Sequence, residues 1–285
     1  MSGSDGGAAQ LEVRDLVVTF GGVRAVDGVS LELQAGEVVA LVGANGSGKT
    51  TLLDAISGLV IPSAGQLLLD GEDVSDLLPE ERAAMGVVRS FQDARLYPEL
   101  TVEDALLVCQ DGRHPSDVVS ITFRLPWARR SERSKRAEVG AVIGSFRLGA
   151  FRHRRIGQLS TGTRRVVDLA SIALARPRLL LLDEPTAGIA QREAEAFVPL
   201  LRRLQEMTGC SVLLVEHDVP LAFELCDRAV VMQAGTAVSS GPPDVVRHDP
   251  RALEAYLGAS EEVLRASGPL RGAQPAEPAG GLAGP

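Results

Sequence analysis

Residues 43–50 read Gly43-Ala44-Asn45-Gly46-Ser47-Gly48-Lys49-Thr50, and this stretch decides the fold class. Its glycines, lysine and hydroxyl residue match the Walker A phosphate loop at every required position. The apolar run 38–42 before it is typical of a buried strand, and residues 51–56 after it have helical spacing. Because this strand, loop and helix order is the context in which the loop functions, we predict that the chain binds a nucleoside triphosphate.

The loop chemistry explains why these residue types are needed. Glycines allow backbone angles closed to other residues, and they let N–H groups and the positive end of the next helix approach phosphates. Of the 29 basic residues only Lys49 and Lys135 are lysines, which argues against a chance glycine-rich turn. We expect Lys49 to reach the β- and γ-phosphates of ATP and Thr50 to give its hydroxyl to Mg²⁺. The predicted nucleotide contacts of the loop are Gly43, Asn45, Gly46, Ser47, Gly48, Lys49, Thr50 and Thr51.

Composition excludes several other classes of protein. The chain has 285 residues, 45% of them hydrophobic and 23% charged, which is typical of a globular protein. A formal net charge of −8 argues against bulk attraction to nucleic acid, so we expect no nucleic-acid partner. Apolar runs such as 179–182 are far shorter than the roughly 20 residues of a spanning helix. With no signal-peptide pattern at its start and three cysteines without metal spacing, the chain is expected to be cytoplasmic with reduced thiols.

The pattern of strands predicts an α/β fold. Residues 11–14 and 30–33 alternate like strands around Gly21-Gly22, which indicates a small antiparallel sheet before the phosphate loop. Helical patterns separate the later apolar runs, which favours a parallel sheet. Between about 99 and 158 the chain is helical and Arg-rich, so an inserted helical subdomain is expected there. The later strand-like runs are 67–69, 87–88, 179–182, 212–215 and 229–232.

These patterns divide the chain into three segments. We expect a flexible N-terminus over 1–10 and an ATPase domain over 11–258. The segment 259–285 is dominated towards its end by Gly, Pro and Ala, so we expect a largely disordered tail. The predicted fold is therefore a phosphate-loop ATPase core with a small N-terminal antiparallel β subdomain and an inserted α-helical subdomain.

A second chemical element is the run Leu179-Leu180-Leu181-Leu182-Asp183-Glu184-Pro185, a strand that ends in two acids. This is a Walker B pattern with an additional carboxylate. We expect Asp183 to hold the Mg²⁺ shell and Glu184 to orient and deprotonate the attacking water. The alternative is a strand that ends in a solvated acidic turn.

Two further elements contribute candidate residues. Ser160 and Gly162 precede a helical run, where free N–H groups and the helix dipole attract anions, although an N-cap serine would look the same. His217 follows the buried run 212–215 and could sense the γ-phosphate, although a lone histidine is more often structural.

From about Leu11 to Gly258 these motifs, in this order, resemble the ATPase subunit of ATP-binding cassette transporters. The resemblance implies that Phe20 stacks on adenine and that Gln92 is the Q-loop residue, with catalytic and Mg²⁺-binding roles. Ser160 and Gly162 resemble the signature motif, and His217 resembles the switch histidine. The resemblance further implies a homodimer, or a heterodimer with a second such ATPase, that encloses two ATP molecules.

Four stretches are most similar to the ATPase subunits of branched-chain amino-acid importers, and related importers of urea and short amides share them. They are residues 18–26, 91–102, 215–218 and 249–258. The resemblance implies polytopic membrane permease subunits and, indirectly, an exported solute-binding protein as partners. It places the chain on the inner face of the cell membrane as a peripheral protein.

Two other classes of function stay open at this point. One is a soluble cassette that acts on ribosomes or nucleic acid, but such relatives usually carry two cassettes in one chain and this sequence has one Walker A loop. Its binding patch would be the arginines at 124, 129, 130, 133, 136, 152, 154 and 155. The other is a regulatory module that binds ATP without hydrolysis, and the intact Glu184 and His217 argue against it.

The chain departs from the family pattern at two places. Thr163 and Arg164 stand where glutamine is usual in the signature motif, and Ala190 replaces the acid or amide of the D-loop. Neither departure removes a residue that the family resemblance places on the reacting phosphate. The expected effects are weaker communication between the two ATP sites and a changed turnover rate.

Overall fold

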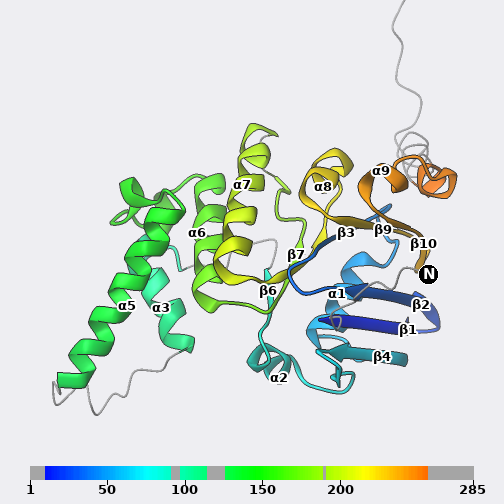
Figure 1. The fold of residues 1–285 in the computed structure, drawn as a ribbon, viewed down its shortest axis with the longest axis horizontal. Coiled ribbons are helices and arrows are strands. Elements are labelled where there is room, and N and C mark those ends of the chain that lie inside the picture. Colours follow the sequence, from blue (N-terminus) through cyan, green and yellow to red (C-terminus); the bar gives the residue numbers. More distant parts are fainter. Residues whose placement is uncertain (1–9, 91–96, 114–125, 189–190, 256–285) are drawn as a thin grey trace, which may run out of the picture.

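The computed structural model describes residues 10–90, 97–113, 126–188 and 191–255. Its centre is a six-stranded sheet in the order β10-β9-β3-β8-β7-β6 (Figure 1). Neighbouring strands are parallel except β10, which pairs antiparallel with β9. The sheet confirms the predicted α/β fold. The strands are β3 (Val38–Val42), β6 (Val87–Ser90), β7 (Leu179–Asp183), β8 (Ser211–Val215), β9 (Arg228–Gln233) and β10 (Thr236–Gly241).

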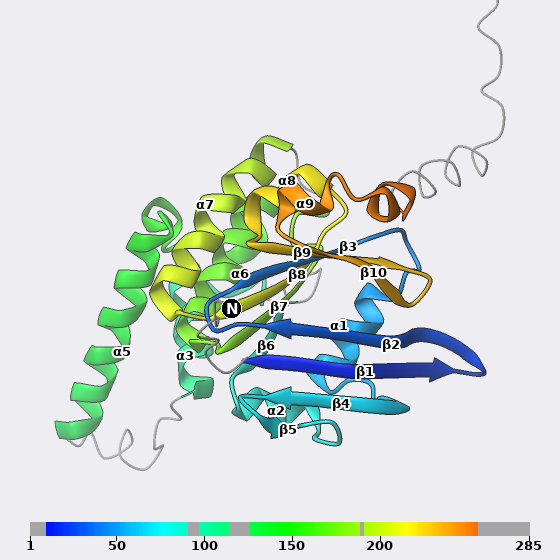
Figure 2. The same ribbon diagram turned by 45° about the vertical axis from the view of Figure 1, so that its right-hand side comes forward.

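The predicted second sheet is antiparallel, in the order β2-β1-β4-β5. Its strands β1 (Leu11–Phe20) and β2 (Val23–Leu33) alternate buried and exposed residues along most of their length. The others are β4 (Ala64–Leu69) and β5 (Glu72–Asp73). Helix α1 (Lys49–Ser57) lies between the two sheets, and its apolar side chains join both sheets in one core (Figures 1 and 2).

Helices cover the other face of the large sheet. The core on this side combines the sheet with α6 (Thr161–Ala175), α7 (Gln191–Thr208), α8 (Val219–Leu225) and α9 (Pro243–Val246). Beyond α6 stand α3 (Val102–Arg113) and α5 (Pro126–Ser145), within the segment expected to be helical (Figure 1). The remaining elements are α2 (Pro79–Ala84) and the short 3₁₀ helices η1 (Gly149–Phe151) and η2 (Ile156–Gln158).

Three details bear on the sequence expectations. Gln10 was expected in the flexible N-terminus, but it is buried and donates from its side chain to the carbonyl of Arg178 at 2.9 Å. The packed core among the described residues therefore includes Gln10. Cys109, Cys210 and Cys226 are free, and burial raises the pKa of each thiol. In the described part of the chain, no helix is long and apolar enough to cross a membrane.

Candidate active site

The phosphate loop connects the end of β3 to the start of α1. Gly43 and Gly48 have φ angles of 152° and 100°, in the region that favours glycine. A Cβ atom would lie 2.1 Å from the Met232 carbonyl oxygen at Gly43 and 2.3 Å from the Ala25 carbonyl oxygen at Gly48. Both contacts are with backbone, which cannot move aside as a side chain can. Strands β9 and β2 therefore support the loop from behind, and no larger residue fits at either position.

Lys49 is buried inside this loop. Its Nζ donates hydrogen bonds to the carbonyl oxygens of Gly43 (2.9 Å) and Ala44 (2.8 Å). Burial lowers the pKa of Lys49, while the nearby carboxylates of Glu184 and Asp183 raise it. A concentrated positive charge with neutral oxygen partners can exchange those partners for phosphate oxygens. Of the other predicted contacts, Ser47 is buried, Gly43, Gly48 and Thr51 are half-buried, and Asn45, Gly46 and Thr50 are exposed.

Asp183 ends β7 and is buried. Its Oδ2 accepts a hydrogen bond from Arg89 Nη2 at 3.1 Å, whereas its Oδ1 is buried and has no hydrogen-bond partner among the described residues. Burial raises the pKa of Asp183, and the adjacent guanidinium of Arg89 lowers it. An unpartnered carboxylate oxygen and the Thr50 hydroxyl are the kind of hard ligands that Mg²⁺ prefers, so these residues fit the metal.

The described residues contain no group of three or more His, Cys, Asp or Glu side chains that could hold a metal ion by themselves. Mg²⁺ is commonly bound by one or two protein ligands together with phosphate oxygens and water. The protein ligands here are therefore sufficient only in combination with a bound nucleotide. Gln92, the other predicted metal ligand, lies outside the described residues.

Glu184 follows Asp183 in a left-handed backbone conformation, with φ 48°. A non-glycine residue in this region stores on the order of 1–2 kcal/mol of strain. Its backbone N–H donates to the Val215 carbonyl at 2.9 Å, which ties the turn to the end of β8. Its carboxylate Oε1 contacts Nε2 of His217. The fold thus joins the predicted base to the predicted γ-phosphate sensor.

Glu216 has a structural role that the sequence did not indicate. Its side chain is buried, and its Oε1 accepts hydrogen bonds from Thr186 Oγ1 at 2.6 Å and Thr186 N at 3.2 Å. Burial raises the pKa of Glu216, and these hydrogen bonds lower it. The carboxylate therefore fastens the turn after Glu184 to the segment that carries His217. Its sequence signal is a charged residue placed directly after the apolar run 212–215.

Ser160 caps the N-terminus of α6, as the N-cap alternative predicted. Its Oγ accepts a hydrogen bond from Thr163 N at 3.2 Å and lies 3.0 Å from Thr163 Oγ1. Among the described residues no hydrogen bond joins Ser160 to the phosphate loop. The fold brings Lys49, Asp183, Glu184 and His217 together, whereas the side-chain hydrogen bonds of Ser160 among the described residues stay within the start of α6.

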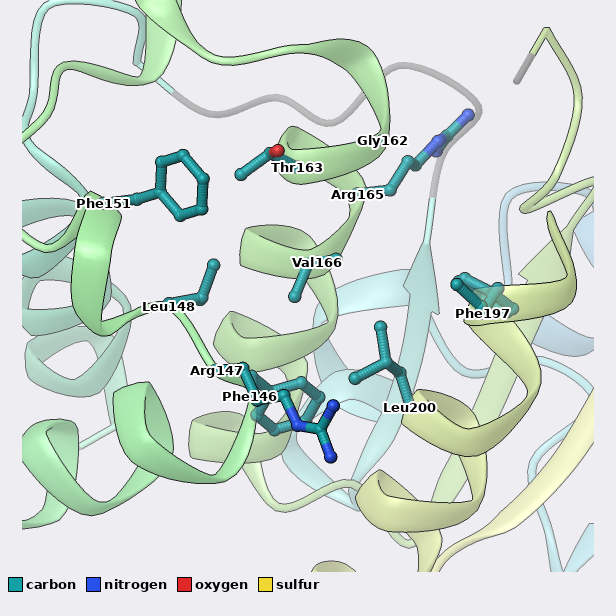
Figure 3. A pocket seen from close by; sticks show the side chains of 11 residues that line it. Phe146, Arg147, Leu148, Phe151, Gly162, Thr163, Arg165, Val166, Phe197 and Leu200 are labelled. Atoms are coloured by element: carbon teal, nitrogen blue, oxygen red, sulfur yellow. The ribbon is translucent and has the colours of Figure 1, made fainter. Parts of the chain in front are cut away.

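A cavity of about 230 Å³ lies beside this end of α6, against α7 (Figure 3). Figure 3 shows the Phe151 ring facing Thr163, while Leu200 of α7 points towards Val166 of α6. Leu148 also lines the cavity. Gly162 is half-buried at the same cavity. The start of α6, which carries the predicted signature residue Gly162, therefore lies against a cavity lined largely by apolar side chains.

Two further expectations concern exposed residues. Phe20 ends β1 with 50% of its surface exposed, so its ring is available for stacking.

The arginines proposed as a nucleic-acid patch are partly engaged within the chain. Arg152 pairs with Glu103, at 2.6 Å between Nη2 and Oε1, and Arg154 lies over the Phe151 ring at 5.9 Å.

Comparison with known proteins agrees with this geometry. Residues 26–187 match the family model described as ABC transporter, and residues 238–262 match one described as branched-chain amino acid ATP-binding cassette transporter. The chain is 37% identical over 248 residues to the high-affinity branched-chain amino acid transport ATP-binding protein BraF of Pseudomonas aeruginosa. It is 36% identical over 250 residues to the corresponding protein LivG of Escherichia coli. Each match covers 87% of this chain and 97% of the relative.

The fold is also similar to solved structures of ATP-binding cassettes from ABC transporters. The crystal structure of the ADP conformation of an ATP-binding cassette of an ABC transporter superposes with a TM-score of 0.74 at 26% identity. It covers 88% of this chain and 99% of the other. A nucleotide-free cassette superposes with a TM-score of 0.72 at 25% identity, covering 87% and 98%.

Proposed function

The chain belongs to the ATP-binding cassette (ABC) transporter family, and from this premise we propose that it energises an importer of branched-chain or related amino acids. The chain is an ATP hydrolase of this family. The observation that carries the proposal is the meeting of Lys49, Asp183, Glu184 and His217 at the carboxyl ends of β3, β7 and β8. The solute assignment is supported by the names of the relatives and by the match over residues 238–262.

The proposed hydrolysis uses the residues in separate roles. Lys49 would exchange the carbonyls of Gly43 and Ala44 for the β- and γ-phosphates. Thr50, Gln92 and Asp183 would hold Mg²⁺, which would supply positive charge to the phosphates. Glu184 would accept the proton of the water whose oxygen attacks the γ-phosphorus, while the bond to the leaving ADP oxygen breaks. His217 would hold the Glu184 carboxylate in position through their contact.

A second cassette is needed to complete this site. Ser160 and Gly162 begin α6, and the hydrogen bonds of Ser160 are made within the start of that helix. We propose that each ATP lies between the phosphate loop of one cassette and the Ser160 segment of its partner, either a second copy or a related chain. Polytopic permease subunits would receive the motion at the inner face of the cell membrane, and an exported binding protein would deliver the solute.

Transport by the reconstituted complex tests the proposal. The chain would be co-expressed with candidate polytopic permease subunits, purified with them and placed in proteoliposomes containing ATP. We expect uptake of leucine, isoleucine or valine with wild-type protein and none with Glu184→Gln. Uptake of urea or a short amide instead would reassign the solute and keep the importer function. ATP hydrolysis without any membrane-subunit association would contradict the importer function.

A further inference from the structure

Arg89 connects three parts of the nucleotide site. It lies near the end of β6, and only 9% of its side chain is exposed. Its Nη2 donates to Asp183 Oδ2 at 3.1 Å. Its Nη1 forms an ion pair with Asp54 on α1 and lies 3.3 Å from Ser57 Oγ. A single guanidinium therefore bridges the phosphate-loop helix and the strand that carries the Walker B carboxylate.

This bridge makes the two oxygens of Asp183 different. Oδ2 accepts the hydrogen bond from Arg89, whereas Oδ1 is buried and has no hydrogen-bond partner in the part of the chain that the structure describes. Leaving a buried acceptor unpaired is unfavourable by about 1–3 kcal/mol, so a buried orphan oxygen indicates a ligand. Because one oxygen is held, rotation of the carboxylate is restricted, and the orphan oxygen keeps one orientation.

The other end of the bridge leads back to the metal-binding hydroxyl. Asp54 follows Thr50 by four residues, which is about one helical turn on α1. Arg89 thus links the first turns of α1, which carry Thr50, to the end of β7, which carries Asp183. A planar guanidinium can hold two carboxylates at once, whereas the single ammonium of lysine holds them less specifically.

We propose that Arg89 is a positioning residue for Mg²⁺: it holds Asp183 by Oδ2, leaves Oδ1 for the metal or its water, and sets the spacing to Thr50 through Asp54. The inference rests on the proposed Mg²⁺-dependent hydrolysis. It adds a residue outside the Walker motifs, three positions before Gln92 in the sequence. Residues that orient a metal ligand typically contribute 10–100-fold to metal affinity.

Mn²⁺ binding to the full chain tests this role without any turnover. The metal would be titrated in the presence of a non-hydrolysable ATP analogue, and free Mn²⁺ measured by electron paramagnetic resonance. We expect Arg89→Met to weaken Mn²⁺ binding on the order of tenfold and Arg89→Lys to weaken it less. Binding of a fluorescent ATP analogue in the presence of EDTA should stay within about twofold of wild type, because the phosphate loop is unchanged.

Matched controls separate positioning from general damage. Arg228→Met removes another partly buried arginine of the same sheet, which pairs with Glu37 at 2.8 Å between Nε and Oε1. It should leave Mn²⁺ binding unchanged. If Arg89→Met does not fold, Arg89→Lys and Asp54→Asn decide the question, and both are expected to weaken Mn²⁺ binding while keeping nucleotide binding in EDTA.

Three results would overturn the proposal. Unchanged Mn²⁺ affinity in folded Arg89 variants would remove the role, and tighter Mn²⁺ binding would make Arg89 a competitor of the metal. If the Arg89 variants lost nucleotide binding in EDTA as strongly as they lost Mn²⁺ binding, the role of Arg89 would be structural. If wild type itself bound no Mn²⁺ with nucleotide, the proposed metal-dependent hydrolysis would fail. If wild type bound the metal and Asp183→Ala lost it, a normal Arg89→Met would reject the positioning role alone.

Discussion

Nε2 of His217 contacts Oε1 of Glu184, which joins the side chains that follow two neighbouring parallel strands, β8 and β7. The His217 side chain is 41% exposed and that of Glu184 is 19% exposed, so the pair lies at the edge of the site rather than in the core. A hydrogen bond from the imidazole orients the carboxylate without removing its proton-accepting oxygen. The pair can therefore act as one unit on the attacking water.

The first prediction concerns Glu184, the proposed base, and Lys49 of the phosphate loop. Glu184→Gln should bind MgATP with near wild-type affinity but lose turnover by about 10²–10⁴-fold, because a positioned base contributes that much. Lys49→Ala should lose tight ATP binding. Phosphate release and equilibrium binding of a fluorescent ATP analogue check the two variants. Wild-type turnover by purified Glu184→Gln would show that Glu184 is not the base.

The second prediction concerns the signature segment. Thr163 sits beside the capping Ser160, where glutamine is usual, and Ala190, outside the described residues, replaces a D-loop acid or amide. Introducing Thr163→Gln and Ala190→Asp into Glu184→Gln should raise the dimer fraction with ATP. Size-exclusion chromatography with light scattering measures it. An unchanged elution profile with ATP would reject the idea that these residues weaken the dimer.

The third prediction concerns the contact with the membrane subunits. Leu96 lies outside the described residues, but Tyr97 is 65% exposed, so packing inside the chain does not account for its ring. Tyr97→Asp should keep basal ATPase activity and reduce co-purification with the permease and solute uptake. Tyr97→Phe is the matched control and should behave as wild type. Normal uptake by well-folded Tyr97→Asp would remove this surface from the interface.

The fourth prediction is a dependence of stability on pH. Half-buried Asp168 lies on α6, where burial raises its pKa to about 6 and Arg165 opposes the shift. Because the folded pKa lies above the unfolded value, the charged form penalises folding above pH 6, and the penalty disappears as the pH falls towards 4. Asp168→Asn should therefore raise the free energy of unfolding at pH 8 by about 1–3 kcal/mol.

Urea denaturation at pH 8 and at pH 4 measures this difference for Asp168. We expect the advantage of Asp168→Asn to vanish at the lower pH. Asp244→Asn, at a highly exposed position, is the control and should show little change at either pH. A less stable Asp168→Asn at pH 8 would mean that the attraction to Arg165 outweighs the cost of burial.

The fifth prediction concerns the C-terminal end of the phosphate-loop helix. Arg82 is fully buried, and its guanidinium donates to the carbonyl oxygens of Ala55 (2.5 Å), Ile56 (2.9 Å), Ser75 (2.9 Å) and Leu77 (3.1 Å). A cation there satisfies the last carbonyls of α1 and complements its dipole. Arg82→Met should lower the free energy of unfolding by about 3–5 kcal/mol, because several buried acceptors lose their donor. Urea unfolding measures it, and a loss below about 1 kcal/mol would contradict this role.

Sequence patterns identified most strands and the helices around the phosphate loop, because alternation and apolar runs are local properties. They did not indicate β5 or β10. Strand β5 is only two residues long, and β10 at the sheet edge is largely polar, so neither carries an apolar signal. The ABC family and its ATPase activity also followed from the order of motifs, and the comparisons confirm both.

The sequence by itself determined where the backbone must be glycine and where a strand must end in carboxylates, since these requirements act within a few residues. Only the tertiary structure decided which polar side chains meet. Arg89 and Asp183 are 94 positions apart, and Thr186 and Glu216 are 30 apart. No local pattern specifies such pairs, because the partner of a buried charge is selected by the packing of whole elements against one another. The orphan oxygen of Asp183 exists for the same reason: its strand is placed beside an arginine that occupies only one of its two oxygens.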